Sequence, residues 1–262
     1  MPSADYLELI SAAERFTREA LERMGTDPSH DWHHVHRVRQ LSLALSRCSS
    51  LSAPPDLLVL ELAALFHDVA DAKYAVPGTS ASSVLGPFFE EWTHVVTPDQ
   101  RRLVERICAN VSWSKDEKRR RARAQAEARG EEESGLEKEE REWRETCPEL
   151  ACVSDADRLD AIGSIGIMRV SAFSAARQRP LYIPPANAEG DSVPPAEQGE
   201  GYNGSAVAHF HEKLLKIKGD RLSTDMARAE AERRQGMMRS FLTELDLEWM
   251  FADQGAQLVL MQ

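Results

Sequence analysis

Histidine and aspartate side chains gather in three short stretches of the sequence. Four of the eight histidines fall between residues 30 and 36, His67 is followed directly by Asp68, and three further aspartates occupy residues 155–160. Imidazole nitrogens and carboxylate oxygens are ligands of hard and borderline divalent cations. If the three stretches lie on separate helices that meet in a bundle core, they can surround one metal ion.

The pair His67-Asp68 ends an apolar run from Leu57 to Phe66. Such a run should be buried, whereas histidine and aspartate resist burial unless they are paired or bound to a metal. Neighbouring residues of a helix point about 100° apart, so both side chains can approach one ion near the end of the helix. A local cap made by a His-Asp pair is the alternative that the dipeptide alone leaves open.

Helices are expected to position these side chains. Apolar residues recur every three or four positions along most of the chain, which is typical of amphipathic helices. The pattern predicts helices over residues 5–24, 31–45, 56–69, 81–92, 98–111, 153–175, 205–218 and 223–250. Alternation of polar and apolar residues, the signal for strands, is scarce. We therefore predict an all-α fold in a single domain over residues 1–262.

Two segments interrupt this helical plan. Residues 115–146 are rich in charge and poor in apolar side chains, which predicts either a projecting charged helix or partial disorder. The segment is a solvated insertion or an arm that binds a protein partner. Residues 179–204 are rich in proline and glycine and are expected to form a flexible loop, either a lid or a linker.

The composition indicates which kinds of partner the protein is expected to bind and in which cellular compartment it is expected to lie. The chain has 262 residues and a net charge of -11, which disfavours binding of bulk nucleic acid. The first residues lack the pattern of a signal peptide, and no apolar run reaches the roughly 20 residues that span a bilayer. The four cysteines form no CxxC pair, as in a protein with reduced thiols. We expect a cytoplasmic protein without a membrane partner, with the nucleus and a homodimer as open alternatives.

The three stretches resemble the H…HD…D signature of the HD superfamily of metal-dependent phosphohydrolases. His34, the pair His67-Asp68 and Asp157 occur in the order of that signature. The surrounding residues look most like a branch of predicted nucleotide (pyro)phosphohydrolases. The matching strings are residues 29–34, 64–74 and 155–163, with further similarity over 205–215 and 233–242. The resemblance implies a compact HD-domain helical bundle in which His34, His67, Asp68 and Asp157 bind the metal.

Catalytic roles follow from the same resemblance. In related HD nucleotidases an acidic residue three positions after the HD aspartate assists proton transfer, which makes Asp71 the candidate general acid or base. Helix capping is the alternative for Asp71. Arg37 and Lys73 are positive groups beside the metal motifs and are expected to offset the charge that develops on phosphate.

Three further side chains are candidates for binding substrate. Arg158 is expected either to bind phosphate or to pair with Asp155 or Asp160. His33 and Lys213 are weaker candidates, because both are also expected as ordinary surface residues.

The sequence also suggests roles for three residues outside the catalytic and substrate-binding candidates. Asp31 is a preferred residue for an N-cap and is expected to begin a helix. Trp32 either packs in the core or stacks on a base. Asn110 stands where many family members carry histidine, which argues for one metal ion instead of two.

The expected reaction is hydrolysis of a nucleotide with one divalent ion. Manganese is the first choice, and cobalt, nickel, iron, magnesium and zinc are alternatives. The resemblance implies cleavage of a nucleoside triphosphate to the monophosphate and pyrophosphate. A nucleoside 5'-monophosphate phosphatase is one alternative. A non-catalytic, metal-stabilised binding module that uses residues 115–146 is the other.

Overall fold

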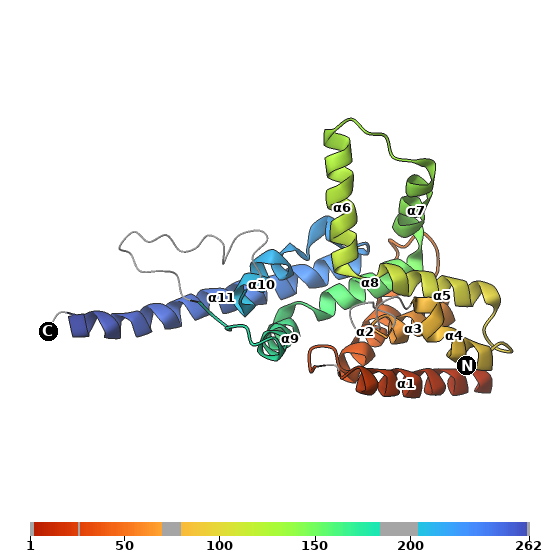
Figure 1. Ribbon diagram of the computed structural model, residues 1–262, viewed down its shortest axis with the longest axis horizontal. Coiled ribbons are helices and arrows are strands. Elements are labelled where there is room, and N and C mark those ends of the chain that lie inside the picture. Colours follow the sequence, from red (N-terminus) through yellow and green to blue (C-terminus); the bar gives the residue numbers. More distant parts are fainter. Residues whose placement is uncertain (1–2, 26, 70–79, 184–203, 261–262) are drawn as a thin grey trace. The chain divides into compact units, whose positions relative to one another are not determined.

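The computed structural model describes residues 3–25, 27–69, 80–183 and 204–260, with side chains to residue 255 (Figure 1). Within these ranges the chain forms α-helices and short 3-10 turns and contains no strand. The predicted all-α fold class is confirmed. No single described helix is long and apolar enough to cross a membrane. The bent pair Pro148–Asp160 and Gly163–Ala176 is long and apolar enough when its two helices are taken together, judged by length and composition only.

The chain divides into two compact units. The first contains Met1–Thr26, His30–Arg158 and Leu222–Ala227, and the second contains Asp27–Ser29, Leu159–Arg221 and Arg228–Gln262. The two units are described separately below. The single-domain organisation stays a prediction.

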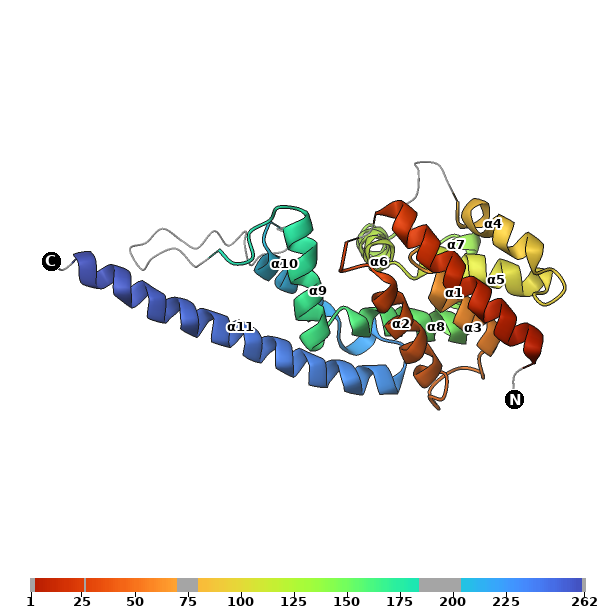
Figure 2. The same ribbon diagram turned by 90° about the horizontal axis from the view of Figure 1, so that it is seen from below.

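The first unit is built around one apolar helix. Its helices are α1 (Ala4–Met24), α2 (Trp32–Leu45), α3 (Leu57–Phe66), α4 (Ala81–Glu91), α5 (Pro98–Asn110), α6 (Trp113–Ala128), α7 (Gly135–Thr146) and most of α8 (Pro148–Asp160). Figures 1 and 2 show α3 enclosed by α1, α2 and α5, which all contact it. Every residue from Val59 to Phe66 is buried. Leucine, valine and alanine dominate α3, so burial of its whole surface stabilises the unit.

Both ends of α3 are set by polar residues. Asp56 caps its N-terminus, because Oδ1 accepts hydrogen bonds from the backbone N–H of Leu58 at 2.9 Å and Val59 at 3.2 Å. The sequence pattern extended this helix to residue 69, whereas α3 ends at Phe66 and residues 67–69 form a turn. His67 and Asp68 therefore lie just beyond the end of the helix.

A buried polar group joins α1, α2 and α3, and we call it the Glu61 cluster (Tyr6, Glu14, Arg39 and Glu61). Glu61 is the charged residue among the buried positions of α3. Arg39 Nε donates to Glu61 Oε1 at 2.7 Å, and the same guanidinium pairs with Glu14. The Tyr6 hydroxyl donates to Glu61 Oε2. These bonds satisfy both carboxylate oxygens of a side chain that burial would otherwise penalise.

The charged insertion of residues 115–146 is ordered as two helices, α6 and α7. Figure 1 shows both projecting from the rest of the first unit. A capping box begins α7, because Ser134 and Glu137 each accept a hydrogen bond from the other's backbone N–H. Ion pairs four residues apart support each helix, such as Arg121 with Glu117 at 3.0 Å. Of the two structures expected for this segment, the helical one is correct.

The second unit contains α9 (Gly163–Ala176), α10 (Ala206–Glu212), the 3-10 turns η2 (Leu214–Lys216) and η3 (Gly219–Arg221), and most of α11 (Asp225–Leu260). The prediction of one helix over 153–175 was wrong, because the chain breaks between Asp160 and Gly163. Gly163 adopts a φ of 78°, and a Cβ on Gly166 would lie 2.3 Å from the carbonyl oxygen of Ala161. Only glycine, which has no Cβ, can lie so close to that carbonyl oxygen at position 166, and the positive φ of Gly163 is also one that glycine adopts readily. Together the two glycines permit the turn between α8 and α9.

The bounds of the other helices of this unit also differ from those predicted. The helix expected over 205–218 ends at Glu212 and gives way to η2, and α11 runs ten residues beyond the expected end at 250. Within the predicted loop of residues 179–204, the carbonyl of Pro180 accepts from the N–H of Ala206 at 3.0 Å. Residues 184–203 lie outside the described part.

Candidate metal centre

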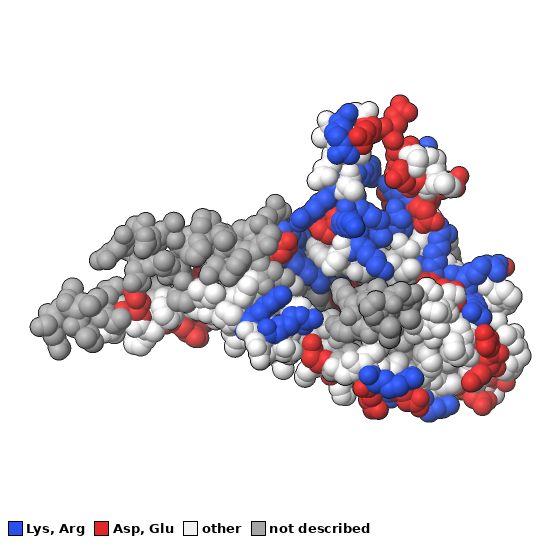
Figure 3. Space-filling view, in the orientation of Figure 1, with Lys and Arg blue, Asp and Glu red and all other residues white. Residues whose placement is uncertain are grey.

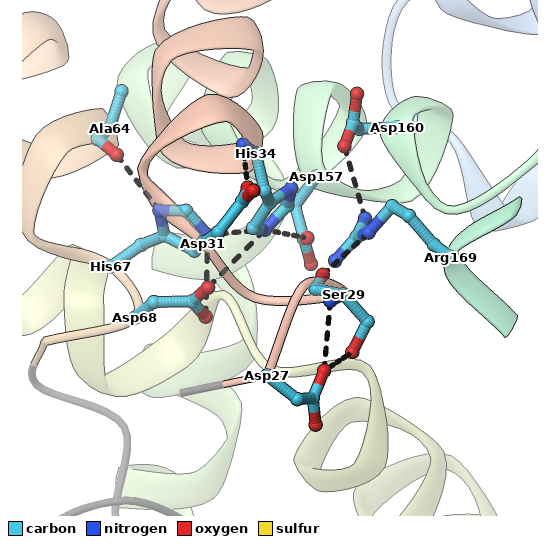
Figure 4. Close-up of polar contacts among 10 residues, drawn as sticks. All are labelled: Asp27, Ser29, Asp31, His34, Ala64, His67, Asp68, Asp157, Asp160 and Arg169. Atoms are coloured by element: carbon cyan, nitrogen blue, oxygen red, sulfur yellow. Dashed lines mark hydrogen bonds and ion pairs between the residues drawn. The ribbon is translucent and has the colours of Figure 1, made fainter. Parts of the chain in front are cut away.

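The buried ends of α2 and α3 place two imidazole rings face to edge. Asp31 is the N-cap of α2, and its Oδ1 accepts from the backbone N–H of His34 at 2.9 Å, as predicted. This cap places His34 in the first turn, with its side chain in the interior. His67 follows α3, and the Nε2 atoms of the two rings lie 3.4 Å apart (Figure 4).

Asp68 completes a group that we call the Asp68 cluster (His34, His67 and Asp68). Its Oδ2 lies 3.3 Å from His34 Nε2, and its Oδ1 lies 3.5 Å from His67 Nε2. All three residues are buried, and one ligand atom from each lies within 4.8 Å of the others. Three of the four residues expected to bind metal therefore converge on one point.

Asp157 approaches the same point from α8. Its Oδ1 lies 3.6 Å from His34 Nε2, and Figure 4 shows the carboxylate directed toward that ring. A quarter of the Asp157 side chain is exposed, compared with one tenth for Asp68 and less for the two histidines. The α8 side is therefore the more open side of the group.

A backbone carbonyl orients the His67 ring. His67 Nδ1 lies 2.8 Å from the carbonyl oxygen of Ala64. A carbonyl can only accept, so Nδ1 carries the proton and Nε2 faces Asp68 and His34. Metal-binding histidines are commonly held in this way, with the second ring nitrogen donating to a carbonyl or carboxylate.

The charge state of Asp68 is also suited to a cation. Burial opposes its ionisation, but the neighbouring His67 and His34 rings outweigh burial and hold the pKa of Asp68 well below its ordinary value. Among the described residues, Asp68 Oδ2 has no hydrogen-bond partner. A buried anionic oxygen without a donor is costly, and a divalent cation held between the imidazoles and the carboxylates would satisfy it. Two imidazoles and two carboxylates therefore fit a divalent metal ion.

The remaining predicted site residues occupy varied positions. His33 is exposed, and Arg37 and Lys213 are partly exposed. Asp71 and Lys73 lie outside the described residues. Arg158 Nη2 lies 3.2 Å from Asp116 Oδ2 on α6, an ion pair that the sequence did not predict. The expected pairing of Arg158 with Asp155 or Asp160 stays a prediction.

The two aspartates beside Asp157 have partners of their own. Asp155 accepts from the backbone N–H of Thr224 at 2.8 Å and from its hydroxyl at 2.9 Å. Burial nevertheless raises the pKa of Asp155, although these hydrogen bonds oppose the shift. In the second unit, Asp160 pairs with Arg169 at 3.1 Å, and Arg169 Nε donates to the carbonyl of Ser29 at 2.7 Å (Figure 4).

Two further expectations concern Trp32 and Asn110. Trp32 is partly exposed, and the guanidinium of Arg18 lies 3.8 Å from its ring centroid. Asn110 donates to the carbonyl of Arg106 at 2.9 Å and accepts from Arg119 Nη1 at 3.2 Å. Sequence reasoning missed this contact between α5 and α6, since no local pattern pairs residues nine positions apart across a helix break.

Comparisons with known proteins identify relatives over almost the whole chain. The sequence matches no model of a known protein family. The uncharacterized protein YpgQ of Bacillus subtilis is 31% identical over 231 residues, which cover 87% of this chain and 90% of YpgQ. The crystal structure of YpgQ in complex with ADP has a TM-score of 0.59 at 25% identity, covering 93% of this chain and 96% of YpgQ.

A second similar solved structure is that of a protein assigned to the HD superfamily. An HD-superfamily hydrolase from Bacillus thuringiensis has a TM-score of 0.58 at 27% identity, covering 93% of this chain and 98% of that protein. The histidines and aspartate of the HD signature meet in the first unit as the sequence predicted. From this geometry and these relatives we conclude that the chain belongs to the HD superfamily of metal-dependent phosphohydrolases.

Proposed function

We propose that this protein hydrolyses a nucleoside triphosphate to the monophosphate and pyrophosphate. One divalent ion, with manganese as the first choice, would be held by His34, His67, Asp68 and Asp157. The observation that carries the proposal is the buried Asp68 cluster, with an anionic oxygen that lacks a hydrogen-bond donor among the described residues. The ADP bound to YpgQ supports a nucleotide as the ligand.

The chain's own residues prepare the site for this chemistry. When bound, a divalent ion supplies Lewis acidity that polarises a phosphate oxygen and acidifies water. The Ala64 carbonyl keeps His67 Nε2 directed inward, and the Asp31 cap holds the start of the helix that carries His34. The partly exposed Asp157 marks the side from which a phosphate group would approach.

The remaining roles are part of the same proposal. Asp71 would transfer the proton, Arg37 and Lys73 would offset charge on phosphate, and Arg158 would hold the substrate on the α8 side. His33 and Lys213 would contribute weaker contacts. Arginine suits this task because its planar fork matches two phosphate oxygens at once.

Product analysis tests the reaction directly. The metal-free protein is loaded separately with manganese, cobalt, nickel, iron, zinc or magnesium and incubated with nucleoside tri-, di- and monophosphates. We expect pyrophosphate from triphosphates, with manganese most active. Orthophosphate released from monophosphates would replace the proposal with the monophosphatase. Absence of turnover with metal bound would favour the non-catalytic binding module.

Neighbouring histidines supply a matched control for the site. His34 is fully buried in the Asp68 cluster, whereas His33 beside it is exposed. We expect His34→Ala to abolish metal-dependent turnover and His33→Ala to retain most of it. Equal loss in both variants would contradict the assignment of His34 as a ligand.

A further inference from the structure

Arginine side chains from three helices converge at the foot of the arm formed by α6 and α7. They are Arg119 on α6, Arg144 on α7 and Arg158 on α8. Arg158 reaches Asp116, one turn before Arg119 on α6, while Arg119 reaches Asn110 on α5 and Arg144 shares Glu140 with Arg106 of α5. Burial and the charges of Arg144 and Arg158 lower the pKa of Arg119, and Asp116 and Glu140 oppose the shift. Figure 3 shows lysine and arginine side chains gathered around the foot of α6, although the whole chain carries a charge of -11.

Two carboxylates are shared among the arginines of this region. Asp116 Oδ2 lies 3.2 Å from Arg158 Nη2 and 3.6 Å from Arg120 Nε. Glu140 Oε2 lies 3.7 Å from Arg144 Nη1, and its other oxygen accepts from Arg106 at 2.5 Å. Each carboxylate therefore serves two guanidinium groups.

Arg119 stands out among these arginines. It is half-buried, and its Nη1 donates to the neutral side-chain oxygen of Asn110 at 3.2 Å. No carboxylate of the described residues lies within ion-pair distance of it. Bringing a partly buried guanidinium close to two others is unfavourable, and Asp116 and Glu140 offset this repulsion without forming an ion pair with Arg119. A bound anion that contacts all three guanidinium groups would relieve it further.

We propose that Arg119, Arg144 and Arg158 form a subsite for a condensed phosphate group, the di- or triphosphate portion of a nucleotide. Guanidinium forks match phosphate oxygens, and a short chain of phosphates offers enough oxygens to reach three helices. Arg158 directly follows Asp157, so the subsite adjoins a proposed metal ligand in sequence. The inference rests on the proposed function and assigns part of its substrate to the arm.

The charge of the arm favours a short anion over an extended one. Beyond the arginines, the turn and α7 expose many glutamates: Glu131, Glu132, Glu133, Glu137, Glu139 and Glu142. Figure 3 shows red side chains over the turn and α7, next to blue side chains at the tip of α6. A nucleic acid strand lying across the arm would be repelled there, whereas two or three phosphates at the foot would not.

Direct binding tests the subsite independently of catalysis. Inorganic tripolyphosphate is titrated by calorimetry into the full-length protein in a chelator, so that no metal contributes. We expect Arg119→Gln to weaken binding about tenfold or more and Arg119→Lys to weaken it less, since lysine keeps the charge and loses the fork. Thermal unfolding of each variant checks that the fold is retained.

Arg121→Gln is the matched control. Arg121 lies on the same helix, is half-exposed and pairs with Glu117, so its loss should leave tripolyphosphate binding unchanged. Equal weakening by Arg121→Gln would reduce the effect to general surface charge and overturn the subsite. No binding of tripolyphosphate by the wild type, or tighter binding of a short single-stranded DNA, would overturn it as well.

Kinetics separates this inference from the proposed function. With metal present, we expect Arg119→Gln to raise KM for a nucleoside triphosphate about tenfold and to leave hydrolysis of bis-p-nitrophenyl phosphate, which lacks a polyphosphate, unchanged. Arg119-dependent tripolyphosphate binding without any nucleotide turnover would keep the subsite and reject the proposed function. Nucleotide turnover with both KM and tripolyphosphate binding unaffected by Arg119→Gln would reject the subsite alone.

Discussion

The first unit contains two buried polar groups, the Glu61 cluster at the middle of α3 and the Asp68 cluster just beyond its C-terminus. They differ in whether every buried carboxylate oxygen accepts a hydrogen bond. In the Glu61 cluster, both carboxylate oxygens of Glu61 accept hydrogen bonds, from Arg39 and from Tyr6. In the Asp68 cluster, Asp68 Oδ2 is buried without a hydrogen-bond donor among the described residues. The hydrogen bonds of the first group are complete within the protein. In the second group, Asp68 Oδ2 lies 3.3 Å from His34 Nε2 but accepts no hydrogen bond from the described residues.

This difference separates a structural role from a binding role. Buried polar groups that hold helices together normally satisfy one another. An acceptor that is left over in a buried, anionic site indicates a ligand. Burial of charged side chains alone would not have told the two groups apart, since Glu61 is as buried as Asp68.

The two groups also join the same helices. Arg39 lies five residues after His34 on α2, and Glu61 lies six residues before His67 on α3. The Glu61 cluster therefore holds α2 against α3 in the packing that brings the two imidazoles within 3.4 Å. Its effect on the metal site should act through the stability of that packing.

The largest expected effect comes from breaking the Asp68 cluster. Asp68→Asn keeps the shape of the side chain and removes the charge, so metal binding and the Lewis acidity that depends on it should be lost. The resulting fall in kcat/KM should be about a thousandfold, the equivalent of several kcal/mol of transition-state stabilisation. Metal content by elemental analysis and initial rates measure both effects. A variant that kept its metal and its rate would show that Asp68 is not a ligand.

Breaking the Glu61 cluster should reduce stability instead. Glu61→Ala leaves Arg39, whose side chain is only 14% exposed, with Glu14 as its remaining carboxylate partner. Removing one partner of a buried ion pair costs about 3–5 kcal/mol, and the Glu14 pair places this case near about 3 kcal/mol. Urea unfolding of the metal-free protein measures the free energy of unfolding.

An apolar replacement of the whole group supplies the control. Tyr6→Phe, Arg39→Met and Glu61→Leu combined should be close to neutral in stability, because a well-packed apolar group often replaces a buried ion pair without loss. Metal affinity should stay at the wild-type value. A large fall in metal affinity at unchanged stability would mean that the Glu61 cluster does more than hold the helices.

Sequence reasoning predicted those features that depend on local pattern. Periodicity located α1 to α5 to within a few residues, the residue type at position 31 predicted the cap of α2, and the order of motifs predicted which side chains approach one another. Glu61, a lone charge in an apolar helix, was an available signal for a buried ion pair. The metal ligand roles themselves stay predictions.

Features that depend on contacts between distant segments were not predictable in this way. The break after Asp160 depends on how closely the Ala161 carbonyl approaches Gly166, which periodicity does not report. The carbonyl that orients His67 belongs to the backbone of Ala64 and leaves no trace in residue type. The convergence of Arg119 with Arg144 and Arg158 requires three helices to meet, and a charge run in the sequence looks the same without it.

The smallest expected effect is a change in alkaline stability that belongs to the Glu61 cluster alone. Burial raises the pKa of Tyr6 well above its ordinary value, and the hydrogen bond to Glu61 raises it further. The neutral phenol is therefore favoured by folding. Its contribution to the free energy of unfolding is complete below about pH 10, the unfolded pKa, and is lost as pH rises toward the folded pKa.

The free energy of unfolding of the wild type should fall with pH more steeply than that of Tyr6→Phe above about pH 10. The difference in slope should be less than about 1.4 kcal/mol per pH unit, because Tyr6 is partly exposed to solvent. Urea unfolding of both proteins at closely spaced pH values measures the slopes, and identical slopes would show that the Tyr6 proton does not contribute to this group.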